Sequence, residues 1–407
     1  MAEASSGVAR TVRRWAVVEA VLLLALVLWF GSGWLADSKD QEFNPTLAPG
    51  PATVTERAAE VHGAAKVIDL HADSLLWRRD LLEDRGWGHV SLPKLVQGGV
   101  ALQVFSMVTK VPRGQNFRAN RGDSDRLIPL MMANHWPPTT WFDPLGRARH
   151  QARRLEEFVE RSQGGLLAIR DRSDLETLAD RRSEGDPVVG ALLAIEGLHG
   201  LADDPEASRE QLRELHRLGL RMLAPVHFFD NTLGGSAHGV DQGGLTDLGR
   251  RIVEEAEALG MVIDLAHASG PTFYDALVDA RHPRVVSHAG VRGTCDSSRN
   301  LSDDQLRLLA RNGGVIGIAF FDEAVCGDDV GAILDAIDHA VAVAGIDHVG
   351  LGSDFDGTVT TPIDAAGLPV LTEGLLDRGY SEDEIAKILG GNAWRILNQV
   401  LPGPEGP

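Results

Sequence analysis

Residues 67–73, Val-Ile-Asp-Leu-His-Ala-Asp, form a short apolar run that ends in polar side chains. Near-continuous apolar runs are typical of parallel strands that are buried on both faces. The sequence predicts eight such strands, and Val67–Leu70 is the first of them. The other runs are Val100–Val108, Val189–Ile195, Arg221–Val226, Met261–Leu265, Arg284–Ser287, Gly314–Phe320 and His348–Gly352.

Amphipathic segments separate these runs and predict helices between the strands. They include Ser208–Leu218, Leu245–Leu259, Ser302–Arg311 and Gly331–Ala344. Strands that alternate with helices build right-handed βαβ units, so the sequence predicts an α/β fold, a (β/α)8 TIM barrel over residues 61–400. Residues 110–186 depart from this rhythm, with helix-like Leu145–Ser162 inside them, and are interpreted as an insertion.

The N-terminal part of the chain has the pattern of a membrane anchor. Residues 1–14 form a basic flank, and the apolar run from Trp15 to Trp34 spans 20 residues. At about 1.5 Å per residue such a helix crosses a hydrocarbon core of ~30 Å. We therefore expect a transmembrane anchor at 15–35, with the N-terminus in the cytoplasm because the arginines precede the run.

A cleaved signal peptide is the alternative for this segment. No clear small-x-small cleavage site follows the run, so an uncleaved anchor or uncleaved signal is favoured. Residues 36–60, which contain several prolines, are interpreted as a linker to the folded domain.

Composition excludes some classes of function. The formal net charge of −19 argues against a nucleic-acid partner, because such binding needs clustered basic residues. The chain has two cysteines, Cys295 and Cys326, whose spacing excludes a zinc finger. Two idle thiols are the favoured interpretation, and a disulfide stays open if the domain faces an oxidising compartment.

Polar residues cluster at the ends of the expected strands. His71 and Asp73 are two residues apart, so their side chains point to the same side of a strand. Further histidines and carboxylates follow other strands: Glu196, His227, His267, His288, Asp354 and Asp356. All fall on the carboxyl side of the strands, where barrel enzymes assemble their active sites.

These residue types predict a metal site and hydrolysis. Imidazole and carboxylate ligands suit Zn²⁺ and similar ions. Two ions ~3.5–4 Å apart need a bridging group, and Glu196 can bridge with its two oxygens. Metals held in this way lower the pKa of a bound water and polarise a carbonyl, which favours attack on an amide or ester.

Six short motifs in order resemble one known family. They are Asp69–Asp73, Glu196-Gly197, Asp264–Ser269, Ser287-His288, Ser298–Asn300 and Gly352–Gly357. From about Val67 to Trp394 the chain resembles the membrane (renal-type) dipeptidases among the amidohydrolase-like barrels. The resemblance implies a zinc-dependent dipeptidase that uses a hydroxide between two metals and tolerates a D-residue at the C-terminal position.

The resemblance also implies roles for individual residues. His71, Asp73 and Glu196 would hold one zinc ion, and Glu196 would share the second with His267 and His288. Three further residues would act on the substrate: His227 on the carbonyl oxygen, Arg299 on the terminal carboxylate, and Asp354 on protons or the amino group.

The roles of several other polar residues stay open. Arg299 has an alternative as the ion-pair partner of Asp303. His238, in the Gly-rich segment 236–239, is either part of a substrate lid or a loop histidine. Asp356 is favoured as a turn residue, and two more histidines, His199 and His216, are interpreted as structural.

The expected setting is a bacterial envelope. The chain would be a single-pass membrane protein with its catalytic domain periplasmic or extracellular. The expected partners are a dipeptide substrate and the membrane, with a homodimer as an open option. The alternatives are another metal hydrolase (an N-acyl amino acid hydrolase, lactonase or deaminase) and, less favoured, a non-catalytic envelope protein.

Overall fold

The computed structural model describes residue 15 and residues 31–278 and 280–403. The anchor expected at 15–35 therefore lies mostly outside the described residues, and the basic flank 1–14 lies entirely outside them. Among the described residues, no helix combines the length and the apolar character needed to cross a membrane.

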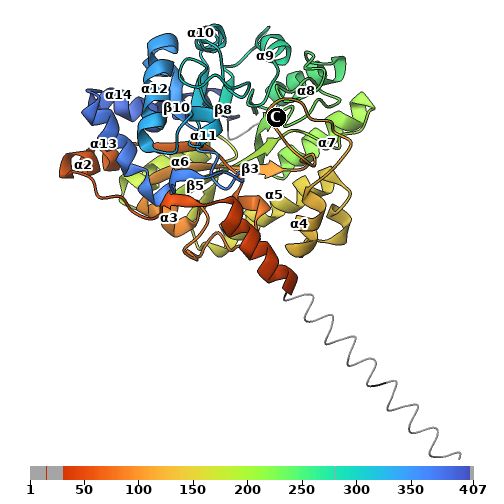
Figure 1. The fold of residues 1–407 in the computed structure, drawn as a ribbon, viewed down its shortest axis with the longest axis horizontal. Helices are drawn as coiled ribbons and strands as arrows, with labels where there is room; N and C mark the ends of the chain where they lie inside the picture. Colours follow the sequence, from red (N-terminus) through yellow and green to blue (C-terminus); the bar gives the residue numbers. More distant parts are fainter. Residues whose placement is uncertain (1–14, 16–30, 279, 404–407) are drawn as a thin grey trace, which may run out of the picture.

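The core of the fold is a curled parallel sheet surrounded by helices (Figure 1). Each of the eight expected runs overlaps one strand of its main path. In spatial order these strands are β7 (Val262–Ile263), β6 (Leu220–Ala224), β5 (Val189–Glu196), β3 (Val100–Val108), β2 (Val67–Ala72), β10 (Val349–Leu351), β9 (Val315–Ile318) and β8 (Val285–Ala289).

The two end strands of this path, β7 and β8, also meet each other. A parallel bridge joins Asp264 to Val285, and the N–H of Leu265 donates to the carbonyl of Val285 at 2.7 Å. The regular ladder is short here because the carboxylate of Asp264 accepts from the backbone N–H groups of Ala266 and Ser287, at 2.9 and 2.8 Å. A side chain thus replaces ladder hydrogen bonds at this edge.

Helices cover the sheet and close one end of it. One buried cluster packs Ala393, Ile396 and Leu397 of the last helix against residues such as Ile68 and Leu102 from the strands. The main helices are α2 (Glu56–Ala64), α5 (Pro144–Arg161), α6 (Arg172–Ser183), α7 (Pro205–Arg217), α8 (Asp247–Ala258), α9 (Gly270–Leu277), α10 (Asp303–Arg311), α12 (Val330–Ala344), α13 (Pro369–Asp377) and α15 (Asn392–Val400). Shorter helices are α3 (Leu92–Gln97), α4 (Leu127–Ala133), α11 (Asp322–Val325) and α14 (Glu382–Ala386).

The segment expected as a linker contains regular structure. Residues 31–43 are helical, shown in red at the lower side of the domain in Figure 1. Strand β1 (Thr46–Ala48) follows and pairs in parallel with β11 (Thr361–Ile363). The prolines and polar residues of 36–60 gave a loop signal, but Asp40 and Asn44 are buried against distant parts of the chain.

The region expected as an insertion, 110–186, belongs partly to the sheet layer. Strand β4 (Leu166–Ala168) pairs with β5, and α5 packs on β3, β4 and β5. A strand of three residues is too short to give a periodic signal, which explains why the sequence did not predict β4. Residues 110–143 of this region carry α4 and lie beside the functional site.

Candidate active site

The polar residues expected at strand ends meet in one buried cluster. The last two residues of β2, β5 and β8 include His71, Glu196 and His288, respectively. The others directly follow strands: Asp73 after β2, His227 after β6, His267 after β7 and Asp354 after β10. All seven are at most 8% exposed. The fold therefore brings together every metal ligand that the sequence predicts.

Glu196 lies at the centre of this cluster. Its Oε1 is 2.7 Å from Nε2 of His267 and 3.1 Å from Nε2 of His288. Its Oε2 is 3.1 Å from Nε2 of His227 and 3.8 Å from Nε2 of His71. Four imidazoles thus face one carboxylate, and each oxygen of that carboxylate serves a different pair.

The ligand atoms form overlapping groups of metal-binding size. His71, Asp73 and Glu196 form one group, and Glu196, His267 and His288 form another, each with its ligand atoms within 4.8 Å of one another. These are the two sets that the family resemblance implies. A third group joins His71 and His288 to Asp354, whose Oδ1 is 4.0 Å from Nε2 of His71.

Unpaired buried atoms show that these residues fit a metal. Nε2 of His71, Oδ1 of Asp73 and Oε1 of Glu196 are buried and, although they lie close to other ligand atoms, make no hydrogen bond of regular geometry among the described residues. Leaving a buried polar atom unpaired costs roughly 1–3 kcal/mol. A metal ion would bind such atoms, and the nitrogen and oxygen donors are those that Zn²⁺ and its neighbours prefer.

Burial and mutual charge set the protonation of the cluster. Burial lowers the pKa of His267 and His288 well below the usual value and that of His227 to about 4. Burial would also lower the pKa of His71, but Glu196 and other nearby carboxylates raise it to about 10. Burial opposes ionisation of Glu196, yet the surrounding imidazoles hold its pKa well below its usual range.

Buried hydrogen bonds orient the imidazole of His288. Ser287 Oγ donates to Asp264 Oδ2 at 2.6 Å and lies 2.8 Å from Nδ1 of His288. Because the Ser287 hydrogen points to Asp264, its oxygen accepts from Nδ1–H of His288, which leaves Nε2 free toward Glu196. Such outer contacts fix the tautomer and the direction of metal-binding imidazoles.

Asp69 has a similar supporting role beside His71. Its carboxylate accepts from the backbone N–H and the hydroxyl of Ser353, both at 2.7 Å, and from Gln103 at 2.8 Å. These bonds join the end of β2 to the residue before Asp354. No role is predicted from the sequence for Asp69 or Asp264, although a carboxylate inside an apolar run is a signal that could have identified both.

Three backbone positions near the cluster have left-handed conformations that are unusual outside glycine. The φ angles are 61° at His267, 62° at Asp354 and 64° at Asp356. Such conformations cost of order 1–3 kcal/mol each and persist where surrounding contacts hold them. They turn the chain sharply after β7 and β10, which directs His267 and Asp354 into the cluster.

Arg299 lies at the same site rather than in a surface ion pair. It is 4% exposed, and its Nη2 donates to the carbonyl of His288 at 2.6 Å. Burial lowers its pKa, while Asp354 and Glu196 oppose that change. Asp303, the alternative partner, instead lies 2.8 Å from Nε2 of His339.

His238 packs behind the cluster. Its ring lies 5.2 Å from that of His267, and it is fully buried. Its carbonyl accepts from the backbone and the side chain of Asn120, at 2.7 and 3.0 Å, so it ties its segment to the 110–143 region. His238 is not among the residues that line the large cavity described below.

Asp356 does more than form a turn. Its carboxylate is fully buried, pairs with Arg79, and accepts from Ser74 Oγ at 2.5 Å and from the N–H of His89 at 2.7 Å. The favoured reading of Asp356 as a turn residue therefore describes its backbone and leaves out its side chain. The two histidines interpreted as structural pack elsewhere: His199 stacks on Phe229 at 4.4 Å, and His216 lies on α7.

The two cysteines form a disulfide, so the expectation of idle thiols is wrong. Cys295 and Cys326 are 31 residues apart in sequence, and their Cα atoms are 5.3 Å apart. The bond joins the loop that carries Arg299 to the end of α11. Sequence spacing gave no signal, because only the packing of α11 beside this loop brings the two thiols together.

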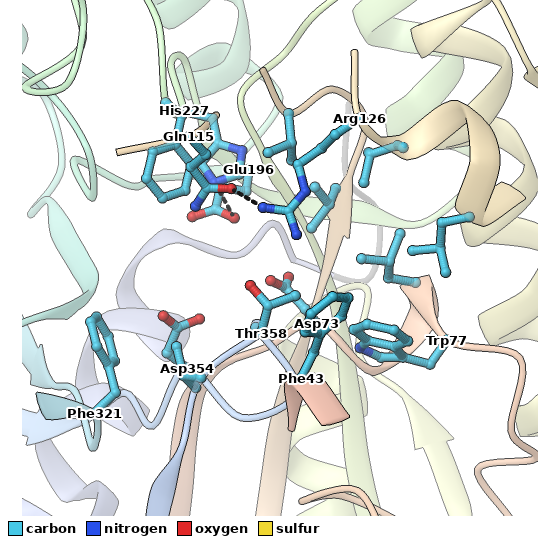
Figure 2. Close-up of a pocket in the computed structure, with 18 of the residues that line it drawn as sticks. Phe43, Asp73, Trp77, Gln115, Arg126, Glu196, His227, Phe321, Asp354 and Thr358 are labelled. Carbon is cyan, nitrogen blue, oxygen red and sulfur yellow. Dashed lines mark hydrogen bonds and ion pairs between the residues drawn. The ribbon is translucent and has the colours of Figure 1, made fainter. Parts of the chain in front are cut away.

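A cavity of about 1020 Å³ opens over the cluster. Figure 2 shows Glu196 and His227 on one side, facing Asp354 and Asp73 on the other. Arg126 enters the same space from the start of α4. Trp77 and Phe43, the latter from the helix 31–43, line the same part of the cavity. The cavity therefore connects the cluster to parts of the chain outside the strand ends.

Comparison with known proteins identifies the family. The sequence model of the membrane dipeptidases, peptidase family M19, matches residues 55–402. The chain belongs to the membrane dipeptidase family. It is accordingly a metal-dependent hydrolase of the peptide bond in dipeptides.

Relatives cover most of this chain. Dipeptidase aclJ of Aspergillus oryzae is 37% identical over 362 residues, covering 82% of this chain and 78% of the relative. Dipeptidase 3 of Macaca fascicularis is 30% identical over 353 residues, covering 83% and 69%.

A crystal structure of a Rhodobacter sphaeroides metallopeptidase with a phosphinate mimic of L-Ala-D-Ala is similar to the fold. Its TM-score is 0.66 with 27% identity, and the likeness covers 83% of this chain and 99% of that one. The structure of a dipeptidase AC of family M19 has the same scores and coverage.

Proposed function

We propose that this dipeptidase uses two zinc ions that share Glu196. The observation that carries the proposal is the overlap of two ligand groups at one carboxylate. His71, Asp73 and Glu196 would hold one ion, and Glu196, His267 and His288 the other. Ions bound there would lower the pKa of a water molecule and polarise the substrate carbonyl.

The remaining residues would bind and orient the dipeptide. The guanidinium of Arg299 faces the cavity and suits a bidentate contact with the terminal carboxylate of the substrate. His227 is neutral at neutral pH, because burial lowers its pKa to about 4, and its Nε2 lies beside Glu196. From this position it would donate a hydrogen bond to the oxygen on which charge develops.

Asp354 is suited to move a proton. Burial raises its pKa well above the usual value, which favours the protonated form of the carboxyl. Its Oδ1 lies 4.0 Å from Nε2 of His71, at the edge of the cluster. We assign to Asp354 the transfer of a proton to the leaving amine.

We also propose tolerance of a D-residue at the C-terminal position of the substrate. The support is the phosphinate mimic of L-Ala-D-Ala bound by the Rhodobacter sphaeroides metallopeptidase, which is 27% identical. Hydrolysis of L-Ala-L-Ala, L-Ala-D-Ala and D-Ala-L-Ala by the full-length, zinc-loaded protein tests this. Cleavage of the first two compounds is expected, and refusal of L-Ala-D-Ala beside rapid cleavage of L-Ala-L-Ala would contradict it.

The curled sheet is proposed to be a closed (β/α)8 barrel. The bridge between Asp264 and Val285 supports this closure, because it links the two end strands of the path. With the ends joined, the carboxyl ends of all eight strands of the path face one mouth. That arrangement places the cluster where barrel enzymes carry their active sites.

We propose that the catalytic domain lies outside the cytoplasm, tethered by the segment 15–35. Two features support this: the apolar run preceded by arginines, and the disulfide between Cys295 and Cys326, since disulfides persist in oxidising compartments. Protease added to spheroplasts, from which the outer layers of the envelope have been removed, should digest the domain of a C-terminally tagged chain. Protection until the spheroplasts are lysed would contradict this location.

A further inference from the structure

The cavity over the cluster extends well beyond the metal ligands. Its volume of about 1020 Å³ is at the upper end of the ~300–1,000 Å³ typical of pockets for drug-sized ligands, and a small dipeptide needs less. The extension has apolar walls, which we name the side chamber. It is lined by Phe43, Leu76, Trp77, Val108, Val111 and Leu127.

These walls form a separate apolar cluster in the fold. Leu76, Trp77, Val108, Val111 and Leu127 pack together, with Phe43 against them. Helix 31–43, which supplies Phe43, precedes the stretch that matches the family model, residues 55–402. The side chamber is therefore built partly from a segment outside the family match.

Arg126 is a cation that projects into this apolar space, and Lys39, which also lines the cavity, pairs with Glu42. Arg126 lies at the start of α4, is partly buried, and lines the cavity with its guanidinium pointing inward in Figure 2. Its Nη1 donates to Gln115 Oε1 at 3.2 Å, and its guanidinium carbon lies 5.9 Å from the centre of the Phe43 ring.

No carboxylate among the described residues forms an ion pair with Arg126. The neighbouring Asp125 pairs instead with Arg147, at 2.5 Å. Burial lowers the pKa of Arg126, and no nearby acid opposes this. A partly buried cation without a counter-ion is unfavourable, and an anionic ligand group would offset that cost.

The position of the substrate connects this cation to specificity. With the terminal carboxylate at Arg299 and the peptide bond at the cluster, as in the proposed function, one substrate side chain can extend into the side chamber. Apolar walls suit its methylene groups, and the guanidinium of Arg126 suits a carboxylate at its end. We propose that the side chamber is a subsite for a dipeptide side chain that ends in a carboxylate, as in glutamate.

The test compares charged and neutral side chains of equal size. Values of kcat/KM are measured for Ala-Glu against Ala-Gln and for Glu-Ala against Gln-Ala, with the full-length, zinc-loaded protein. In at least one order, the glutamate compound should be preferred by about tenfold, since hydrogen bonds to charged groups contribute roughly 1.5–3 kcal/mol. Arg126→Gln should abolish that preference, because it should lower kcat/KM for the glutamate compound about tenfold more than for its glutamine partner.

A matched variant controls for net charge. Arg121→Gln removes an exposed arginine from the same region, outside the cavity lining, and should keep the preference. Equal kcat/KM values for the glutamate and glutamine compounds in both orders, or a preference that survives Arg126→Gln, would overturn the proposed subsite. Neither result would affect the assignment of dipeptidase activity. Failure to cleave any of the four compounds would instead overturn the proposed function on which the subsite rests.

Discussion

Arg79 donates from one nitrogen to both carboxylate oxygens of Asp40, at 2.6 Å each, and both side chains are at most 3% exposed. Asp40 belongs to the helix 31–43. Arg79 also pairs with Asp356, two residues after Asp354. A second link lies beside it, because Asn44 Oδ1 accepts from the N–H of Thr358 at 2.9 Å. The helix before the family match therefore holds the loop that carries Asp354.

Replacing Asp40 should weaken both the fold and catalysis. Asp40→Ala leaves Arg79 buried with one partner fewer, and breaking a buried pair typically costs roughly 3–5 kcal/mol. We expect a loss of this size in urea unfolding and a lower kcat because the Asp354 loop is less firmly held. The control is Glu42→Ala on the same helix, whose exposed pair with Lys39 should contribute less than about 1 kcal/mol. Equal effects of the two substitutions would contradict the link.

Loss of the disulfide should destabilise the domain and weaken substrate binding. A bond that closes a loop of 31 residues contributes roughly 3–4 kcal/mol by the chain-entropy relation. It also holds the loop that carries Arg299. Cys295→Ala with Cys326→Ala should lower the urea midpoint and raise KM, and a reducing agent should do the same to the parent chain only. A parent chain that unfolds identically with and without reductant would show that the bond does not form.

Metal binding should release a proton from His71. In the metal-free protein, burial opposes but three carboxylates raise its pKa to about 10, so at pH 8 the imidazole carries a proton that a metal must displace. Apparent zinc affinity should therefore rise with pH up to about 10 and fall as acid restores the proton. Calorimetry in two buffers of different ionisation enthalpy counts the protons released. Zinc binding to the His71→Asn variant should release fewer protons. A heat of zinc binding that is the same in both buffers for the parent protein would contradict the prediction.

Arg299 should control KM for substrates with a free carboxylate. Arg299→Met removes a buried cation that faces the cavity, so we expect KM for a dipeptide to rise by roughly 10- to 100-fold, in line with ~1.5–3 kcal/mol for bonds to charged groups. The same dipeptide with an amidated C-terminus should show little difference between variant and parent. Arg292→Met, on the exposed part of the same loop, is the control. An equal loss for acid and amide would assign Arg299 a structural role.

The sequence predicts the parts of this structure that repeat a local pattern. Apolar runs predict the eight strands of the main path, and single histidines or carboxylates after those runs predict the cluster around Glu196. Features that depend on contacts between distant segments cannot be predicted from such local patterns. The Cys295–Cys326 bond depends on how α11 packs, and the role of Asp40 depends on a partner 39 residues further along the chain.

Sequence patterns also fail to predict very short strands and hydrogen bonds made by side chains. Strand β4 has three residues, too few for a period, and β7 is short because Asp264 replaces part of its ladder. Buried carboxylates such as Asp69 and Asp264 interrupt apolar runs, which is a signal in the sequence. Its meaning becomes clear only when the hydroxyls of Ser353 and Ser287 are seen to bond to them.

The central claim is that metals bound around Glu196 carry out dipeptide hydrolysis. The most direct measurement titrates the metal-free, full-length protein with zinc while following hydrolysis of L-Ala-L-Ala and the amount of bound metal. We expect no activity without metal and maximal activity at about two bound ions per chain, as the overlapping groups imply. In Glu196→Gln, both the amount of bound zinc and the activity should stay below those of the parent protein. Full hydrolysis by the metal-free protein, or an unchanged titration in Glu196→Gln, would contradict the account.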